Sequence, residues 1–354
     1  MRQMARTWIA AFAAGAAALI AGSASAKDYM GVKCESPPPA HCNGDACTPL
    51  LGDPGNAVDT KTGRKFWLDY PCNLKPGDKV VFILNIHGAG SIGQWQRHYF
   101  PAMDYKDKYK LVVATPTAAT SRAFPGAAPG APGVRVWVAE ADDAHLQNIA
   151  TEVFDAFGRQ NIKSFWLAGH SQGGATSHRI VCSDFFKDKV DGLLSLSGGR
   201  IGRAEINPRF GPPKADGSPP DPRPMPAAMT APPLPACQFS HIFETGEHEI
   251  VSLPATSPLA EQFGCAARVE EKDVADTTPG YVWDYARQGY PVWGMKARAG
   301  SAHIWTYPKC KGGRVVADVE RLDKGHTEGL EPHVTEAIVK LMVAAPGGKL
   351  QHAS

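Results

Sequence analysis

The sequence predicts an α/β fold with a mostly parallel central sheet and helices on both of its faces. Two observations carry this prediction. From Phe66 onward, short apolar runs alternate with longer amphipathic segments, which is typical of strands joined by crossover helices. The composition, 43% hydrophobic and 20% charged over 354 residues, is that of a globular protein rather than a disordered or coiled-coil chain.

Apolar runs rich in β-branched and aromatic residues predict the strands. They lie at 80–84, 110–114, 164–168, 193–196, 241–244 and 315–319. A helix is expected over 142–157, where Leu146, Ile149 and Val153 recur at helical spacing and Asp142 or Asp143 is the expected N-cap. Further helices are expected at 171–186 and 334–343.

One domain, residues 61–345, accounts for all of these elements. Residues 27–60 are rich in Cys, Pro and Gly and predict a stapled N-terminal extension. Within the domain, 11 of the 30 prolines lie between 208 and 236. Because proline breaks helices and central strands, residues 204–236 are interpreted as an insertion. Residues 346–354 are expected to form a flexible C-terminal tail.

The N-terminal residues 1–26 are expected to be a secretory signal peptide. Arg2 and Arg6 precede an uncharged run over 8–22, and small residues follow at 24–26. Fifteen apolar residues are too few to span a bilayer comfortably. The residue after the expected cleavage is Lys27 rather than Cys, which argues against a lipid anchor. We therefore expect an exported protein, periplasmic or secreted, without a stable membrane anchor after cleavage.

Charge and cysteine content narrow the class of protein. There are 37 Lys and Arg against 35 Asp and Glu, so no basic surplus is available for a nucleic-acid partner. The eight cysteines are an even number, which in an exported protein favours disulfides. His41, Cys42 and Cys47 form an alternative zinc site, but neither a CxxC pair nor an HExxH helix is present. We expect no metal.

A candidate nucleophile lies in Gly169-His170-Ser171-Gln172-Gly173, which matches G-x-S-x-G. The motif follows a five-residue apolar strand and precedes a helical segment. A serine on such a turn projects from the edge of the sheet, and the N-terminus of the following helix favours negative charge beside it. This context predicts a nucleophile elbow, whereas an ordinary Gly-rich turn is the alternative.

A second turn supplies a candidate oxyanion hole. His87-Gly88-Ala89-Gly90 follows the strand at 80–84 directly. A turn at that position can present a main-chain N–H to the carbonyl oxygen of an ester. The expected donors are the main-chain N–H groups of Ala89 and Gln172.

The remaining candidates are an acid and a base, which follow the serine along the chain in that order. His326, preceded by Gly325, lies after the last strand and is the expected base, with His303 in reserve. Glu249 follows the strand at 241–244 and is the expected acid, with Glu247 and then Asp323 as alternatives.

These motifs together resemble the α/β-hydrolase fold. In particular, His87-Gly88-Ala89-Gly90, Asp142-Asp143, Gly169–Gly174 and Gly325-His326 resemble the extracellular polyhydroxybutyrate depolymerase and feruloyl esterase-like family, over about residues 65–345. The resemblance implies secreted hydrolysis of carboxylic esters by a serine triad, without metal or other cofactor. The usual acid of the family is Asp, whereas this chain offers Glu249.

The resemblance also implies disulfides between Cys182 and Cys237 and between Cys265 and Cys310. The other four cysteines, at 34, 42, 47 and 72, then pair in one of three ways. The substrate is expected to be an ester, with aromatic and polymeric esters as candidates. Trp95, Tyr99, Phe100 and Trp137 are candidates for its pocket or for core packing. A serine peptidase with the same triad and a non-catalytic binding protein on this fold remain alternatives.

Overall fold

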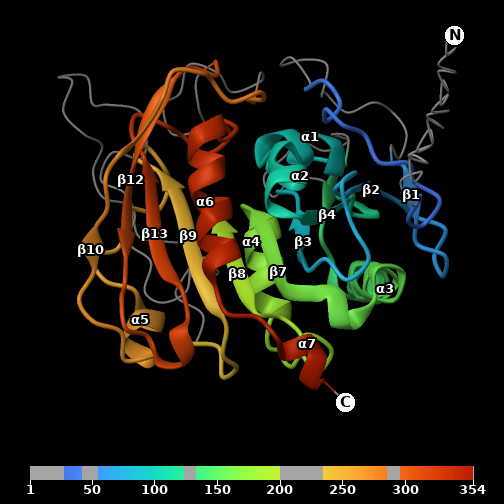
Figure 1. The fold of residues 1–354 in the computed structure, drawn as a ribbon. Helices are drawn as coiled ribbons and strands as arrows, with labels where there is room; N and C mark the ends of the chain where they lie inside the picture. The colour runs from blue at the N-terminus through green and yellow to red at the C-terminus, as the bar shows by residue number, and fades with distance from the viewer. Residues whose placement is uncertain (1–27, 42–54, 123–132, 200–233, 285–295, 354) are drawn as a thin grey trace, which may run out of the picture.

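A twisted sheet of 11 strands runs through the protein (Figure 1). The computed structural model describes residues 28–41, 55–122, 133–199, 234–284 and 296–353. In spatial order the strands are β1 (Ala57–Val58), β2 (Lys65–Asp69), β4 (Leu111–Pro116), β3 (Val80–Ile86), β7 (Ile162–His170), β8 (Gly192–Leu196), β9 (Ser240–Gly246), β13 (Val316–Arg321), β12 (Gly300–Thr306) and β10 (Val269–Glu270), with β11 (Val274–Asp276) also paired to β12.

The six central strands, from β4 to β13, are parallel to one another. Strands β1 and β2 add antiparallel pairs at one edge, and β12, β10 and β11 do so at the other. The chain has the α/β-hydrolase fold, because β3 lies between β4 and the central strand β7 and the remaining parallel strands follow in chain order. The six predicted strands are these six parallel strands, and the antiparallel edge strands are the elements that the prediction lacked.

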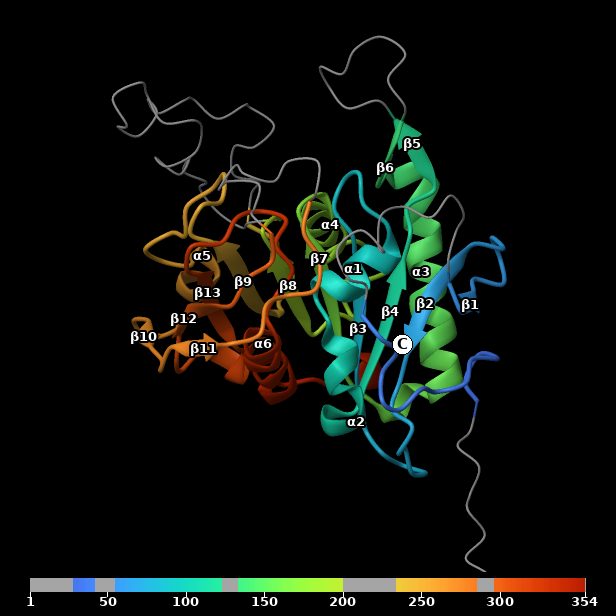
Figure 2. The same ribbon diagram turned by 90° about the horizontal axis from the view of Figure 1, so that it is seen from above.

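Helices cover both faces of the sheet. Within the described residues they are α1 (Gly93–Tyr99), α2 (Lys106–Tyr109), α3 (Ala139–Phe157), α4 (Gln172–Ile180), α5 (Pro258–Gln262), α6 (Pro332–Ala344) and α7 (Lys349–His352). A short hairpin of β5 (Thr120–Arg122) and β6 (Val134–Val136) extends away from the body of the protein (Figure 2).

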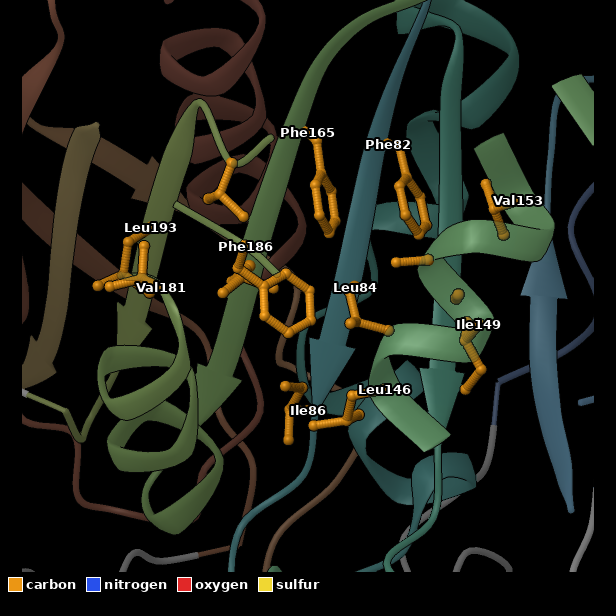
Figure 3. Packing of buried hydrophobic residues seen from close by; sticks show 14 of the residues in the cluster. Phe82, Leu84, Ile86, Leu146, Ile149, Val153, Phe165, Val181, Phe186 and Leu193 are labelled. Atoms are coloured by element: carbon orange, nitrogen blue, oxygen red, sulfur yellow. The ribbon is translucent and has the colours of Figure 1, made fainter. Parts of the chain in front are cut away.

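Alternation along β3 divides the core into two layers. Phe82 and Leu84 belong to the same apolar cluster as Leu146 and Ile149 of α3 (Figure 3). The intervening Ile83 belongs to the other cluster, with residues of α1 and α6. Successive side chains of a strand point to opposite faces, so the unbroken apolar run at 80–84 is that of a strand buried on both sides.

Two helix boundaries differ from the prediction. Helix α3 begins at Ala139 with Val138 as its N-cap, not at Asp142 or Asp143. The Asp142 carboxylate lies one turn into the helix and accepts the N–H of Val138 at 2.9 Å, one position beyond the residue that makes this bond in a capping box. Helix α4 ends at Ile180 rather than near residue 186. Just after this end, the Ser183 N–H donates to the Ile180 carbonyl.

The predicted domain limits need correction at both ends. The sheet begins at β1, inside the segment interpreted as an extension. The C-terminal tail predicted to be flexible contains helix α7. This helix packs against the domain, since Leu350 is 2% exposed and the Lys349 N–H donates to Asp191. The predicted signal peptide lies outside the described residues, and so does the predicted insertion up to residue 233.

Three disulfides link distant parts of the chain. Cys182–Cys237 and Cys265–Cys310 confirm the two implied pairs. Cys34–Cys72 fastens the N-terminal segment to the residues that follow β2, while Cys42 and Cys47 lie outside the described residues. Closing loops of 38 to 55 residues in this way restricts the unfolded chain.

None of the helices in the described ranges has the length and apolar character needed to span a membrane.

Two buried histidines make the fold sensitive to acid. His98 is 2% exposed and His241 is 4% exposed. Burial disfavours the imidazolium and lowers the pKa of each ring from 6.5 to about 3. Between these values the unfolded chain binds more protons than the folded chain. The resulting stability is therefore complete above pH 6.5 and is lost as the pH falls toward about 3.

Replacing His241 with Gln removes one of the side chains that bind a proton in the unfolded chain but not in the folded chain. We expect the free energy of unfolding, measured by urea titration, to decline less steeply with acidification in His241→Gln. The difference in slope is up to about 1.4 kcal/mol per pH unit between about pH 6 and 4. His352→Gln, on the exposed end of α7, is the matched control. Equal slopes in parent and His241→Gln would contradict a neutral buried ring.

Candidate active site

Ser171 occupies the turn between the central strand β7 and helix α4. Its backbone has φ 51° and ψ −117°, a conformation that non-glycine residues rarely adopt. The turn is held in place because the Ser171 N–H donates to the Leu196 carbonyl at the end of β8, at 2.9 Å. The serine therefore stands at the carboxyl edge of the sheet, at the N-terminus of a helix, as the motif predicts.

Glycines on either side of Ser171 permit this turn. A Cβ atom on Gly173 would lie 2.2 Å from the Ile86 carbonyl oxygen, and one on Gly169 would lie 2.3 Å from the Gly173 carbonyl carbon. Both contacts are with backbone, which cannot move aside as a side chain can. The two glycines of G-x-S-x-G are thus required by the close approach of β7, α4 and β3.

His326 and Glu249 complete a hydrogen-bonded chain with Ser171. His326 Nε2 lies 2.8 Å from Ser171 Oγ, and its Nδ1 lies 2.9 Å from both Glu249 carboxylate oxygens. Glu249 is 3% exposed and His326 is 7% exposed. A carboxylate at Nδ1 keeps the proton on that nitrogen and leaves Nε2 free to accept the serine proton. The arrangement is suited to general base chemistry.

The loops that carry Glu249 and His326 are joined along their length. The main-chain N–H groups of Glu247 and His248 donate to the carbonyls of Arg321 and Lys324, each at 2.9 Å. In return, the Asp323 N–H donates to Glu247 Oε2 at 2.9 Å. Glu247 and Asp323, the alternative acids, thus cross-link the two loops, and it is Glu249 that reaches His326.

The reserve base His303 lies elsewhere. It is on β12, where its Nδ1 is 2.7 Å from an Asp273 carboxylate oxygen. With Glu270, these two residues are the one group of three in the described part of the chain with metal-ligand atoms close together, and they are largely exposed. His41, from the alternative zinc site, hydrogen-bonds to His98 and Asp104, and its partners Cys42 and Cys47 lie outside the described residues.

The residue before the serine supports the histidine. His170 is fully buried, and burial lowers its pKa well below the ordinary value, so the ring is neutral. Its Nε2–H donates to the His326 carbonyl at 2.8 Å, and the Tyr99 hydroxyl donates to the same oxygen at 3.3 Å. The motif does not predict this role, because His170 occupies the first of the two unspecified positions in G-x-S-x-G.

The 87–90 turn packs directly against the serine. A Cβ on Gly88 would lie 3.1 Å from Ser171 Cβ and 2.7 Å from His170 Nδ1. His87 holds the turn, since its Nε2 accepts the Ala118 N–H at 3.0 Å and its Nδ1–H donates to the Gly88 carbonyl at 2.7 Å. Burial keeps this ring neutral by lowering its pKa to about 4. The two hydrogen bonds of His87 therefore hold the 87–90 turn in place.

The predicted oxyanion donors lie on these two segments. Ala89 follows Gly88 in the turn, and Gln172 is the first residue of α4, where main-chain N–H groups have no intrahelical acceptor. In the described part of the chain, no main-chain acceptor receives the N–H of either residue. Both groups are thus available to a ligand beside Ser171.

Of the four aromatic candidates, three belong to the core. Tyr99 is 0%, Phe100 1% and Trp137 5% exposed, and all three are members of the apolar clusters. Trp95 is half-buried and stacks on Tyr99, with ring centroids 5.0 Å apart. Only Trp95 among them keeps accessible surface near the site.

A buried ionic network lies behind the His326 loop. Arg321 pairs with Glu244 at 2.6 Å, and Lys324 pairs with Glu331 at 2.8 Å. Glu328 lies 3.6 Å from Lys324, and all five side chains are at most 2% exposed. Lone charged residues give no sequence signal for burial, because Lys, Arg and Glu are almost always exposed. Sequence reasoning therefore missed them.

No protein-family model and no curated protein matches the sequence. Solved structures match the fold. An acetyl xylan esterase from Aspergillus awamori is 13% identical, with a TM-score of 0.42 over 79% of this chain and 94% of that chain. FphF, a fluorophosphonate-binding serine hydrolase of Staphylococcus aureus, is 15% identical, with a TM-score of 0.33 over 53% and 75%. Esterase 2 of Thermogutta terrifontis is 17% identical, with a TM-score of 0.31 over 57% and 74%.

The fold of this chain follows from its own strand order.

The network behind His326 predicts a large difference between two Lys→Met variants. Lys324→Met removes one of the cationic partners of buried Glu328 and Glu331, which keep Arg298 and Arg321 at 3.6 Å, and is expected to lower the free energy of unfolding by about 3 kcal/mol. Lys108→Met, in the exposed pair with Glu336, is the matched control and is expected to change little. Urea unfolding at neutral pH measures both. Equal small effects would mean that the network does not stabilise the loop.

Proposed function

We propose that this protein is an exported serine hydrolase that cleaves carboxylic esters through an acyl-enzyme intermediate. Ser171 is the nucleophile, His326 the general base and acid, and Glu249 the acid that orients the imidazole. The observation that supports this proposal is the continuous chain from Ser171 Oγ through both nitrogens of His326 to the buried Glu249 carboxylate. A strained serine at a helix start, with a positioned base, is the arrangement of an activated nucleophile.

In acylation, Ser171 Oγ forms a bond to the ester carbonyl carbon while its proton passes to His326 Nε2. The carbonyl oxygen becomes an oxyanion, and the main-chain N–H groups of Ala89 and Gln172 stabilise it. Glu249 stabilises the imidazolium that has formed. When the tetrahedral intermediate collapses, the bond to the alcohol breaks and His326 returns the proton to the leaving oxygen.

Deacylation repeats these steps with water. His326 takes a proton from the water as its oxygen attacks the acyl carbon, and the intermediate expels Ser171 Oγ, which regains its proton. The products are the carboxylic acid and the free serine. The carboxylate of Glu249 does not change protonation state in either half, and its contribution is orientation and charge.

The substrate class extends the same proposal. We take the substrate to be an ester. Aromatic esters are a first candidate because half-buried Trp95 lies beside the His170 ring at a centroid distance of 5.7 Å, and polymeric esters are a second because the sequence motifs resemble those of polyhydroxybutyrate depolymerases. The residues proposed for catalysis are supplied by the chain itself, so the mechanism uses no metal or cofactor.

Hydrolysis of p-nitrophenyl esters from acetate to octanoate tests the proposal. The parent is expected to hydrolyse at least one ester, and Ser171→Ala to lose this activity by at least about 10³-fold, since the nucleophile is removed. Glu249→Gln is expected to lower kcat by about 10⁴-fold without unfolding the protein. Ser301→Ala, on strand β12, is the matched control.

Reaction with a fluorophosphonate separates the remaining outcomes. Labelling at Ser171 without ester hydrolysis favours a serine peptidase, which a peptide panel then identifies. No labelling at all would overturn the proposal in favour of a non-catalytic binding protein. Full activity in Ser171→Ala would overturn the choice of nucleophile.

Export is tested separately. When the whole chain is expressed in a Gram-negative host, we expect the mature protein in the periplasm or medium to begin at Lys27, because small residues at 24 and 26 suit signal peptidase. N-terminal sequencing of each fraction measures this. Ala26→Lys should block processing. A cytoplasmic protein that keeps residues 1–26 would contradict export.

A further inference from the structure

The segment 135–137, at the end of β6, contacts both loops that supply the proposed oxyanion donors. On one side, the Trp137 N–H donates to the Gln172 side-chain Oε1 at 3.1 Å, and Gln172 Nε2 donates to the Trp137 carbonyl at 3.3 Å. This two-point pairing fixes which end of the carboxamide is oxygen, because one partner is a donor and the other an acceptor. The side chain of Gln172 is thus committed to Trp137.

On the other side, the same segment holds the turn that contains Ala89. The indole Nε1–H of Trp137 donates to the His87 carbonyl at 2.8 Å, and the Gly90 N–H donates to the Arg135 carbonyl at 2.8 Å. Residues on both sides of Ala89 are therefore bonded to the segment 135–137. The two main-chain donors belong to separate loops, and this segment links them.

The segment is itself anchored from behind. Asp142, 1% exposed, accepts the Val138 N–H at 2.9 Å through Oδ2. Its other oxygen accepts Arg64 at 2.8 Å and the Ala119 N–H at 2.9 Å. The buried Asp142 carboxylate therefore holds the end of β6 against α3. The segment that contacts the Ala89 and Gln172 loops is thus itself held in place.

We propose that the Gln172 carboxamide and Trp137 form a clamp that sets the separation of the Ala89 and Gln172 main-chain N–H groups. Trp137 is a positioning residue in this proposal, because it is 5% exposed and its donors are occupied by protein acceptors. Oxyanion stabilisation requires donors within about 2.7–3.1 Å of one oxygen, so a small change in the separation of the two loops weakens it. The inference rests on the proposed function.

Two variants release the clamp from opposite sides. Gln172→Met keeps the length of the side chain and removes both bonds to Trp137, leaving the main-chain N–H at 172 intact. Trp137→Phe keeps an aromatic ring and removes the bond to His87. Trp305→Phe, on β12 over Arg268, is the matched control and is expected to behave as the parent.

The first measurement is the second-order rate constant of fluorophosphonate labelling, in which Ser171 Oγ bonds to phosphorus and fluoride leaves. We expect both clamp variants to label about 10- to 100-fold more slowly, yet to reach the same final stoichiometry as the parent. Full stoichiometry distinguishes slow reaction from a fraction of unfolded protein. This readout needs no knowledge of the ester substrate.

The second measurement uses whichever p-nitrophenyl ester the parent hydrolyses. We expect kcat to fall by the same factor as labelling while KM changes little, because the clamp acts on the transition state. The affinity of a trifluoromethyl ketone, which forms an oxyanion on Ser171, should weaken in parallel. A merely structural role would lower thermal stability without this split.

The outcomes separate the two proposals. If the parent labels but both variants match it within about twofold, the clamp is overturned while the proposed function stands. If the parent labels but hydrolyses no ester, the ester proposal fails and the labelling rates still decide the clamp. If the parent does not label, no working oxyanion hole exists and both proposals fail.

Discussion

Close approach of three backbone segments at Ser171 is the constraint on which the site depends. Strand β7, helix α4 and the end of β3 come so near that Cβ atoms at Gly169 and Gly173 would lie 2.2–2.3 Å from backbone atoms. This crowding forces the chain to reverse within one residue, and Ser171 takes a φ of 51°. Ser171 itself stays partly exposed at this turn.

The histidine is held by a different kind of interaction. Its loop is tied to the Glu249 loop by main-chain hydrogen bonds, and a network of buried charges lies behind it. Burying charges is costly, and their mutual pairing only offsets that cost. The gain is geometric, because removing any partner would leave a charge in the core, so the loop has one well-defined position. Fixed geometry is what proton transfer between Ser171 and His326 requires.

The central sheet could be predicted from sequence because its strands are buried on both faces. Strands β3, β4 and β7 contain continuous apolar runs of at least four residues, and these runs are distinctive, whereas polar residues interrupt β9 and β13. The edge strands lack this signal. β12 mixes buried Ala302 and Ile304 with partly exposed neighbours, and β1 has two residues. The start of α3 was also misplaced, because Asp142 caps the helix from inside it rather than from its first position.

The sequence by itself determined the fold class, the turn that carries Ser171 and the chain order of serine, acid and histidine. These depend on local properties: apolar period, glycine spacing and position after a strand. Only the tertiary structure decided which of Glu247, Glu249 and Asp323 reaches His326, since all three lie in polar loops. Their roles differ because hydrogen bonds between loops more than 70 residues apart direct one carboxylate inward and occupy the others.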